Sequence, residues 1–262
     1  MPAAYETISS TLADGVLTIQ LNRPEALNCV STTGYRELAH AVGAAADNPD
    51  ADVVVLTGSG RAFCTGGDLK EIALSAADGK LLDKIDEFAD TSMAAFQALE
   101  RCQKVVIAAI NGICQASGVS MVMCSDLAIA ADDVKFRVPE VLVGLADPFV
   151  AARLHGRLGV ARAKWTMLTA DPFSAQEALD WGLVNKIVPK DRLFTEVSEL
   201  AAKLRLTSPK SRAEYKRGMN ETFPALDPNI MLRANRSADA VEGTTAFLER
   251  RSPVWSPLAA AE

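Results

Sequence analysis

Residues 53–68 read Val53-Val54-Val55-Leu56-Thr57-Gly58-Ser59-Gly60-Arg61-Ala62-Phe63-Cys64-Thr65-Gly66-Gly67-Asp68. A continuous β-branched run without polar alternation is typical of a strand that is buried on both faces. Val105 to Ile110 has the same character and leads through Asn111-Gly112 to Ala116-Ser117-Gly118. We therefore expect two buried strands, each entering a turn of small residues with a helix beginning just beyond it.

Other strands and helices are expected on both sides of this stretch. Two β-rich runs between Thr7 and Leu21 flank the turn signal Ala13-Asp14-Gly15, which predicts a hairpin. Ser31 or Thr32 can cap a following helix, and Asn48-Pro49 ends it. Further segments are a helix from about Lys80 to Arg101 and strands at Leu127 to Ala130 and Lys186 to Val188. This alternation indicates an α/β fold with largely parallel strands.

From about Arg192 onward the strand signals vanish. Helical spacing of apolar residues recurs in Val197, Leu200, Ala201 and Leu204, and again from Ala238 to Leu248. Such an apolar stripe must be buried on the body of the protein or on a neighbouring subunit. We divide the chain into an α/β core over residues 1–195 and a C-terminal helical region over residues 196–262.

Composition limits the class of protein. The 262 residues are 49% hydrophobic, enough for one large domain or for a domain with an added helical section. The net charge is −6 and no lysine or arginine block occurs, so we expect no nucleic-acid partner. No apolar run reaches the roughly 18 residues of a membrane span, and Met1 to Thr7 lacks the features of a secretory signal. We expect no membrane association and a cytoplasmic location.

The five cysteines are an odd number at irregular spacing, and the chain has only two histidines. No C-x-x-C pair occurs, so neither a disulfide framework nor a metal site is expected. The cysteines are interpreted as small buried hydrophobic residues.

The two turns of small residues can form a binding site for a carbonyl oxygen. Helix N-termini present unpaired N–H groups, and two of them that converge could bind an oxygen as it gains negative charge. In the alternative interpretation the glycines only serve tight turns and Asp68 only caps a helix. The spacing is not G-x-G-x-x-G, so the dinucleotide-binding fingerprint is absent.

Glu140 lies in the apolar segment from Phe136 to Leu145. Burial there would raise the pKa of its carboxyl toward that of a useful base. Alternatively, Glu140 is a first-turn glutamate after Pro139 that is favoured by the helix dipole and does no chemistry.

Seven segments occur in the order and spacing of a known family. They are Leu21 to Asn28, Gly60 to Lys70, Ile107 to Gly112, Asp126 to Ala131, Pro139 to Val141, Gly182 to Val184 and Glu242 to Arg251. They are distributed across nearly the whole chain and resemble the pattern of the enoyl-CoA hydratase/isomerase, or crotonase, superfamily.

The resemblance implies a spiral of β-β-α units followed by C-terminal helices that mediate trimerisation, hence a homotrimer or a hexamer that is a dimer of trimers. It also implies an acyl-CoA thioester substrate whose carbonyl is polarised by two backbone N–H groups, which map onto Gly67 and Ser117. The substrate-binding positions carried over from the family are Ala26, Leu27, Gly66, Asp68, Leu69, Gly118, Pro139 and Gly144. The chemistry needs no cofactor, because coenzyme A is part of the substrate.

The chain departs from the family's hydratases at one catalytic position. Those enzymes use a second glutamate three residues after the second carbonyl-binding position, and here that residue is Ser120. A lone Glu140 suits the transfer of one proton between two carbons, as in the family's Δ3,Δ2-enoyl-CoA isomerases. We therefore expect isomerisation of a 3-enoyl-CoA to a 2-enoyl-CoA, with Glu140 as the proton shuttle.

Two alternatives follow from the same departures. In a hydratase, Asp147 or a water supported by Ser120 would replace the missing carboxylate, although Asp147 also fits as the cap of a helix that begins at Pro148. In a non-catalytic acyl-CoA-binding homologue, Ser117, which replaces the family's usual glycine, would narrow the thioester slot. The segment from Gly144 to Leu154 also departs from the family, which indicates a remodelled acyl pocket. Residues Glu71 to Thr91 are expected to form part of its wall or a solvated helix face.

Overall fold

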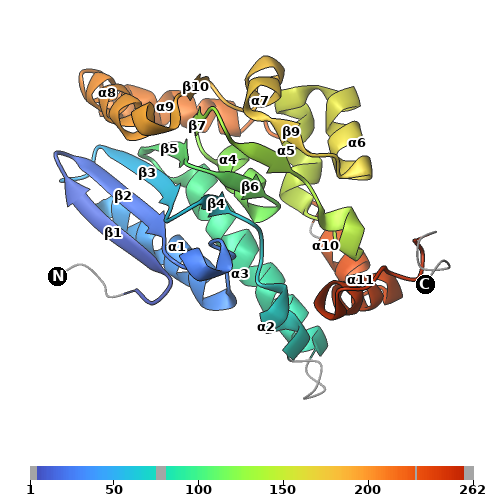
Figure 1. Ribbon diagram of the computed structural model, residues 1–262. Helices are drawn as coiled ribbons and strands as arrows, with labels where there is room; N and C mark the ends of the chain where they lie inside the picture. Colours follow the sequence, from blue (N-terminus) through green and yellow to red (C-terminus); the bar gives the residue numbers. More distant parts are fainter. Residues whose placement is uncertain (1–4, 75–80, 228, 257–262) are drawn as a thin grey trace.

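The computed structural model describes residues 5–74, 81–227 and 229–256. Within these ranges the strands form two sheets with helices packed around them (Figure 1). The first sheet has the order β1 (Ile8–Ala13), β2 (Val16–Leu21), β3 (Val53–Gly58), β5 (Val105–Ile110), β7 (Leu127–Ala131) and β10 (Lys186–Val188). The second has the order β4 (Ala62–Cys64), β6 (Ile113–Gln115), β8 (Lys135–Arg137) and β9 (Phe173–Ser174).

The chain repeats one unit of two strands and a helix. β3, β5 and β7 are parallel neighbours in the first sheet, and the strand after each one, β4, β6 or β8, joins the second sheet. The helices that follow are α3 (Leu81–Arg101), α4 (Ser117–Cys124) and α5 (Pro148–Leu158). This arrangement confirms the expected α/β spiral of β-β-α units.

Gly58 allows the sharp return from β3 to β4. A Cβ atom at this position would lie 2.3 Å from the carbonyl oxygen of Ala62 and 2.4 Å from that of Phe63. No side chain fits there without moving the backbone. The glycine therefore serves the close approach of two strands at this corner.

The long apolar run of β3 is buried on both faces, as its composition predicts. Val54 and Leu56 belong to the main core, which includes residues of α1 (Thr32–Asp47) and α3. Val53 and Val55 point to the other face and pack with Val197 of α8 (Leu193–Arg205). The first apolar stripe of the C-terminal region is thus buried on the protein's own sheet.

Most other sequence predictions of elements agree with the structure. The tight turn of the hairpin consists of Asp14 and Gly15. Their positive φ angles of 48° and 73° suit a two-residue turn. Ser31 caps α1 by accepting a hydrogen bond from the Gly34 N–H. α3 begins at Leu81, and Lys80, where the helix was expected to begin, lies outside the described residues.

The remaining helices surround these sheets. They are α2 (Leu69–Leu74), α6 (Val160–Thr169), α7 (Ala175–Trp181), α9 (Pro209–Asn220), α10 (Asn229–Asn235) and α11 (Ala238–Glu249), with short 3-10 helices η1 (Pro24–Ala26), η2 (Glu140–Val143) and η3 (Lys190–Arg192). The proposed boundary after residue 195 falls inside α8, and the division into two domains stays a prediction. Across the described ranges, none of the helices has the length and apolar character required to cross a membrane.

α9 is fixed to the core by a buried ion pair. Lys216 Nζ lies 2.7 Å from Asp126 Oδ2 and also donates to the carbonyl oxygens of Leu99 and Lys104. α10 and α11 lie beside the lower end of α3 in Figure 1, next to α2. The C-terminal helices therefore cover the region where the small-residue turns and Glu140 lie.

Candidate active site

The two turns of small residues converge in the structure. Val30 N–H donates to Gly66 O at 2.8 Å, and Asp68 N–H donates to Val30 O at 2.9 Å, which holds Gly67 beside Val30. A Cβ atom on Gly66 would lie 2.8 Å from the Cβ atom of Ala116. The segment after β4 is thus in contact with the residue that precedes α4.

Gly67 and Ser117 each present an unused backbone donor. Ser117 is the first residue of α4, where N–H groups lack partners within the helix. Among the residues that the structure describes, neither the Gly67 N–H nor the Ser117 N–H donates to a protein acceptor. Two backbone donors at a helix N-terminus and a neighbouring turn are suited to bind an oxygen that gains negative charge.

Ala116 holds the start of α4 in a strained conformation. Its φ and ψ angles are 49° and −120°, a region that residues with a side chain rarely occupy. Gly118 lets the helix approach β4, because a Cβ atom there would lie 2.6 Å from Cys64 O. Strain and close packing together fix the direction of the first N–H groups of α4.

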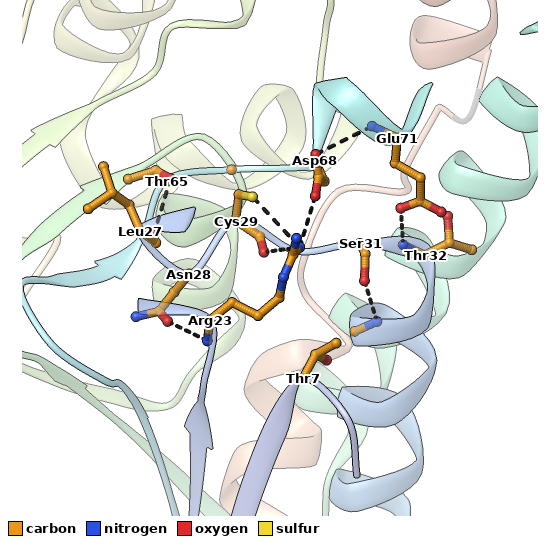
Figure 2. A network of polar contacts seen from close by, with 12 residues as sticks. Thr7, Arg23, Leu27, Asn28, Cys29, Ser31, Thr32, Thr65, Asp68 and Glu71 are labelled. Carbon is orange, nitrogen blue, oxygen red and sulfur yellow. Dashed lines mark hydrogen bonds and ion pairs between the residues drawn. The ribbon is translucent and has the colours of Figure 1, made fainter. Parts of the chain in front are cut away.

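The loop between Arg23 and Cys29 is tied to Asp68 by a polar network (Figure 2). Arg23 Nη1 donates to Asp68 Oδ2 at 2.9 Å and to Cys29 O at 3.1 Å. The buried Asn28 side chain accepts from the Arg23 N–H at 3.0 Å and donates to Ser59 O and Ala62 O at 2.8 Å. The network holds the predicted coenzyme A segment against the turn that carries Gly67.

Ala26 and Leu27 lie on this loop, at the end of η1. Leu27 and Asn28 both have positive φ angles, 52° and 55°, and Thr65 Oγ1 donates to Leu27 O at 3.2 Å. Asp68 also accepts a 3.4 Å hydrogen bond from the Glu71 N–H at the start of α2. Asp68 therefore caps α2 and also forms the ion pair with Arg23. The structure therefore brings Ala26, Leu27, Gly66, Asp68 and Leu69 to one side of the converging turns.

Glu140 is the first residue of η2 and follows Pro139. Its Oε2 atom is buried and has no hydrogen-bond partner in the described parts of the chain. Burial and the negative charge of Asp147 raise the pKa of the Glu140 carboxyl from 4.5 to about 8. The carboxyl is therefore protonated at neutral pH and can exchange a proton near that pH.

Asp147 caps α5 as expected, and its second oxygen makes a further contact. Oδ1 accepts from the N–H groups of Phe149 and Val150 at 2.7 and 3.3 Å. Oδ2 accepts from Ser120 Oγ at 2.6 Å. Burial raises the pKa of the Asp147 carboxyl, while the Ser120 and backbone hydrogen bonds act in the opposite direction.

A buried tyrosine that the sequence did not single out lies next to Ser117. The Tyr35 hydroxyl of α1 is 2.6 Å from Ser117 Oγ. Its ring packs edge-on against Phe88 and Phe96, at centroid distances of 5.3 and 5.8 Å. Nothing in the amphipathic pattern of residues 32–47 separates this tyrosine from an ordinary core residue.

A cavity of about 290 Å³ adjoins the converging turns. Phe88 lines it and also contacts Gly67, where a Cβ atom would lie 2.2 Å from the ring. Leu145 lines it too, and its N–H donates to Glu140 O at 3.0 Å. The other lining residues are Ile72, Ile85, Asn235, Ala240, Val241, Thr244, Thr245, Leu248 and Glu249.

The cavity agrees in part with the expected pocket wall at residues 71–91. Ile72, Ile85 and Phe88 belong to that stretch, whereas residues 75–80 lie outside the described residues. The contribution of α11 was not expected, because helical periodicity alone does not say which surface a helix covers.

Gly144, expected to bind substrate, has a clear packing role. Its φ angle is 69°, and a Cβ atom there would lie 2.5 Å from the carbonyl carbon of Asp239 in α11. Gly243 makes the reciprocal approach, with a Cβ position 2.5 Å from the carbonyl carbon of Val143. α11 is therefore pressed against the backbone of the turn that carries Glu140.

The five cysteines are free thiols, four of them buried. Burial raises the pKa of Cys29 to about 11 and that of Cys64 to about 12. Such thiols are poor nucleophiles at neutral pH. In the part of the chain that the structure describes, no group of three or more His, Cys, Asp or Glu residues is placed to hold a metal ion.

Comparison with known proteins gives consistent matches over nearly the whole chain. The enoyl-CoA hydratase/isomerase family model matches residues 11–257. A crotonyl-CoA hydratase of Syntrophomonas wolfei subsp. wolfei is 33% identical over 258 residues, which are 95% of this chain and 97% of that protein. A carnitinyl-CoA dehydratase of Proteus mirabilis is 32% identical and covers 95% and 98% of the two chains.

A similar solved structure is an enoyl-CoA hydratase from Mycobacterium avium subsp. paratuberculosis K-10. It superposes with a TM-score of 0.85 at 28% sequence identity, and the match covers 97% of this chain and all of that one. The likeness therefore extends to the arrangement of both sheets and of the helices around them.

Proposed function

The chain belongs to the enoyl-CoA hydratase/isomerase family, and on that premise we propose that it adds water reversibly to the double bond of a 2-enoyl-CoA. We choose hydration over isomerisation because Ser120 donates a hydrogen bond to Asp147. The expectation of isomerisation depended on Glu140 being the only carboxyl of the site. The structure gives Ser120 a carboxylate partner from another part of the chain.

The two carboxyls have environments that suit different roles. With a pKa of about 8, Glu140 is protonated at neutral pH and is the proposed donor of a proton to carbon 2. Burial raises the pKa of the Asp147 carboxyl, and three hydrogen bonds act in the opposite direction and favour its ionised form. This ionised form is the proposed acceptor of the proton that water loses as its oxygen bonds to carbon 3. Pairs of carboxyls with opposite protonation states are a recurrent arrangement for acid and base catalysis.

The proposed oxyanion site consists of the N–H groups of Gly67 and Ser117. Addition of water at carbon 3 moves negative charge onto the thioester oxygen, and two fixed donors stabilise that charge without reorganisation. Coenzyme A is part of the substrate, so the proposed reaction uses no metal or redox cofactor. The cavity lined by α3 and α11 would take the acyl group.

Isomerisation of a 3-enoyl-CoA is the second candidate. One observation favours it: Asp147 Oδ1 already accepts two hydrogen bonds as the cap of α5. These bonds limit the ability of the carboxylate to bind and deprotonate a water molecule. In that reaction the carboxylate form of Glu140 would remove a proton from carbon 2 and return it to carbon 4.

Incubation with 2-enoyl-CoA and 3-enoyl-CoA, followed by ultraviolet absorbance and mass spectrometry, separates the two candidates. A gain of one water by the 2-enoyl thioester supports hydration, whereas conversion of the 3-enoyl thioester without a change of mass and without hydration supports isomerisation. Glu140→Gln is expected to abolish either reaction. Asp147→Asn is expected to abolish hydration and to leave any isomerisation, and the proposal of hydration is wrong if water addition survives that substitution.

A further inference from the structure

Ser117 and Tyr35 form a pair of hydroxyls with more protons than hydrogen bonds. Their oxygen atoms lie 2.6 Å apart, and only one of the two protons can lie between them. No other partner of either hydroxyl occurs within the described residues. One of the two protons therefore lacks an acceptor among the residues that the structure describes.

Burial decides which proton lies in the shared bond. Tyr35 has no exposed surface, whereas 9% of Ser117 is exposed. If Ser117 donated, the phenolic proton would be buried without any acceptor, which is costly in free energy. Tyr35 is therefore the donor and Ser117 Oγ the acceptor, and the serine proton is free to point out of the core.

Tyr35 is well placed to keep this role. Its ring lies edge-on to Phe88 and Phe96, at interplanar angles of 87° and 84°, so the phenolic oxygen has little freedom to move. Burial raises the pKa of the Tyr35 hydroxyl well above its ordinary value of 10.0, which keeps the proton in place at neutral pH. The direction of the Ser117 O–H is therefore restricted to the side away from Tyr35.

On the basis of the proposed function, we propose that the Ser117 hydroxyl is a third hydrogen-bond donor to the thioester oxygen, and that Tyr35 is the residue that positions it. The unused N–H at the start of α4 and the free O–H both belong to Ser117. An oxygen bound to that N–H therefore lies close to the hydroxyl. The substrate oxygen would supply the acceptor that the protein lacks. A serine in place of the glycine common in the family would then add a donor rather than only narrow the site.

The first test compares Ser117→Ala and Ser117→Gly with Tyr35→Phe. Both Ser117 variants keep the backbone N–H and lose the hydroxyl, so kcat should fall by about 10²-fold, as for the loss of one oxyanion donor, with a smaller change in KM. Tyr35→Phe should lower kcat less, because Ser117 remains but is no longer oriented. The double variant Tyr35→Phe, Ser117→Ala should be no slower than Ser117→Ala alone.

Binding gives a readout that a purely structural role would not change. We would measure the affinity of each variant for a saturated acyl-CoA and for its thioether analogue, in which a methylene replaces the carbonyl. Ser117→Ala should weaken binding of the thioester and leave binding of the thioether unchanged. Circular dichroism and thermal unfolding identify any variant that fails to fold, and Ser117→Gly is then the second route to the same comparison.

The two proposals fail in different ways. Equal kcat in the wild type and both Ser117 variants, or an equal loss of affinity for thioester and thioether, overturns the third donor. Additive effects of the Tyr35 and Ser117 substitutions overturn the positioning role. The wild type could also bind the thioester more tightly than the thioether through Ser117 and yet turn over no enoyl-CoA. That result would contradict the proposed reaction and would still support the third donor.

Discussion

Glu140 carries an unpaired oxygen in a buried position, and this has a consequence for stability as well as for catalysis. Its pKa of about 8 in the folded protein lies above the ordinary value of 4.5. Between these pH values the native state binds more protons than the unfolded chain, so the free energy of unfolding falls as the pH rises. The residue is thus retained at the expense of stability in mildly basic solution.

Glu140→Gln should remove this pH dependence. Relative to the wild type, the variant should gain stability from about pH 5 to about pH 8, by at most about 1.4 kcal/mol per pH unit. Urea unfolding of both proteins at the two pH values measures the difference. Glu25→Gln, at an exposed position, controls for the loss of a charge. A stability difference between the variant and the wild type that is the same at both pH values would contradict a buried, protonated Glu140.

Asn235 is one of the polar residues that line the cavity. It is only 8% exposed, and its Oδ1 atom accepts a 3.4 Å hydrogen bond from the Ala146 N–H. Within the described residues its Nδ2 donates no hydrogen bond, although the residue lines the cavity. A donor in an apolar pocket favours a ligand that presents an acceptor.

We therefore predict that acyl groups with an oxygen acceptor are preferred over unsubstituted ones of equal length. Asn235→Leu should lower the ratio of kcat/KM for a hydroxylated over an unsubstituted acyl-CoA by about tenfold or more. Thr245→Val is the control, because the Thr245 hydroxyl already donates to Val241 O at 2.7 Å and its loss should leave the ratio unchanged. An unchanged ratio in Asn235→Leu would rule out this role.

At the scale of elements, α11 packs closely against η2, the short helix that begins with Glu140. Gly243 of α11 and Gly144, which directly follows η2, form this contact, and neither position has room for a Cβ atom. A methyl group on Gly243 would push α11 away from Val143 or shift the turn itself. Effective proton transfer depends on geometry within hydrogen-bond reach, so such a shift should be costly.

Gly243→Ala is expected to lower kcat at least tenfold, even though alanine favours a helix more than glycine does. Gly218→Ala in α9 is the matched control, because nothing lies within 4 Å of a Cβ atom there. That variant should keep full activity and gain up to about 1 kcal/mol in stability. Equal activity of the two variants, by steady-state kinetics, would show that the α11 contact does not position Glu140.

The sequence predicted elements where a local pattern is sufficient. The buried run of β3, the caps Ser31 and Asp147 and the bounds of β10 follow from residues that lie close together in the chain. The individual short strands of the second sheet were not located, because β4, β6 and β8 have three residues each, and β4 and β6 fall where the small residues indicated only turns. Strands this short show no periodicity, and only their partners in the sheet define them.

The candidate site was predictable to the same extent. The convergence of Gly67 with Ser117 followed from the two similar turns and from the resemblance. The partners of those residues did not, because the Tyr35 contact with Ser117 and the Asp147 contact with Ser120 span 82 and 27 positions in the sequence. The assigned roles of the site residues stay predictions until the variants are measured.

At the scale of the whole molecule, large apolar side chains remain exposed on the outer helices. Trp165 of α6, Phe194 of α8, Tyr215 of α9 and Phe247 of α11 are each more than half exposed. Exposed apolar side chains of this size are typical of surfaces that bind another subunit. α8 buries Leu193, Val197 and Ala201 on the core, so its outer side is available for this contact.

We predict a homotrimer or a dimer of trimers in solution. Size-exclusion chromatography with light scattering should give three or six times the mass of the chain, independent of concentration in the micromolar range. A charged substitution such as Phe247→Asp should reduce the mass if α11 takes part in the contact, whereas Lys203→Asp would control for a change of surface charge. A monomer at all concentrations would contradict the prediction.

The position of α11 also bears on when the protein becomes active during its synthesis. Both sheets, the converging turns and Glu140 precede this helix in the chain, yet the cavity wall and the support of η2 come from it. Domains generally fold as units during synthesis. We therefore expect the proposed acyl pocket to be closed, and any enzymatic activity to appear, only after α11 has emerged from the exit tunnel.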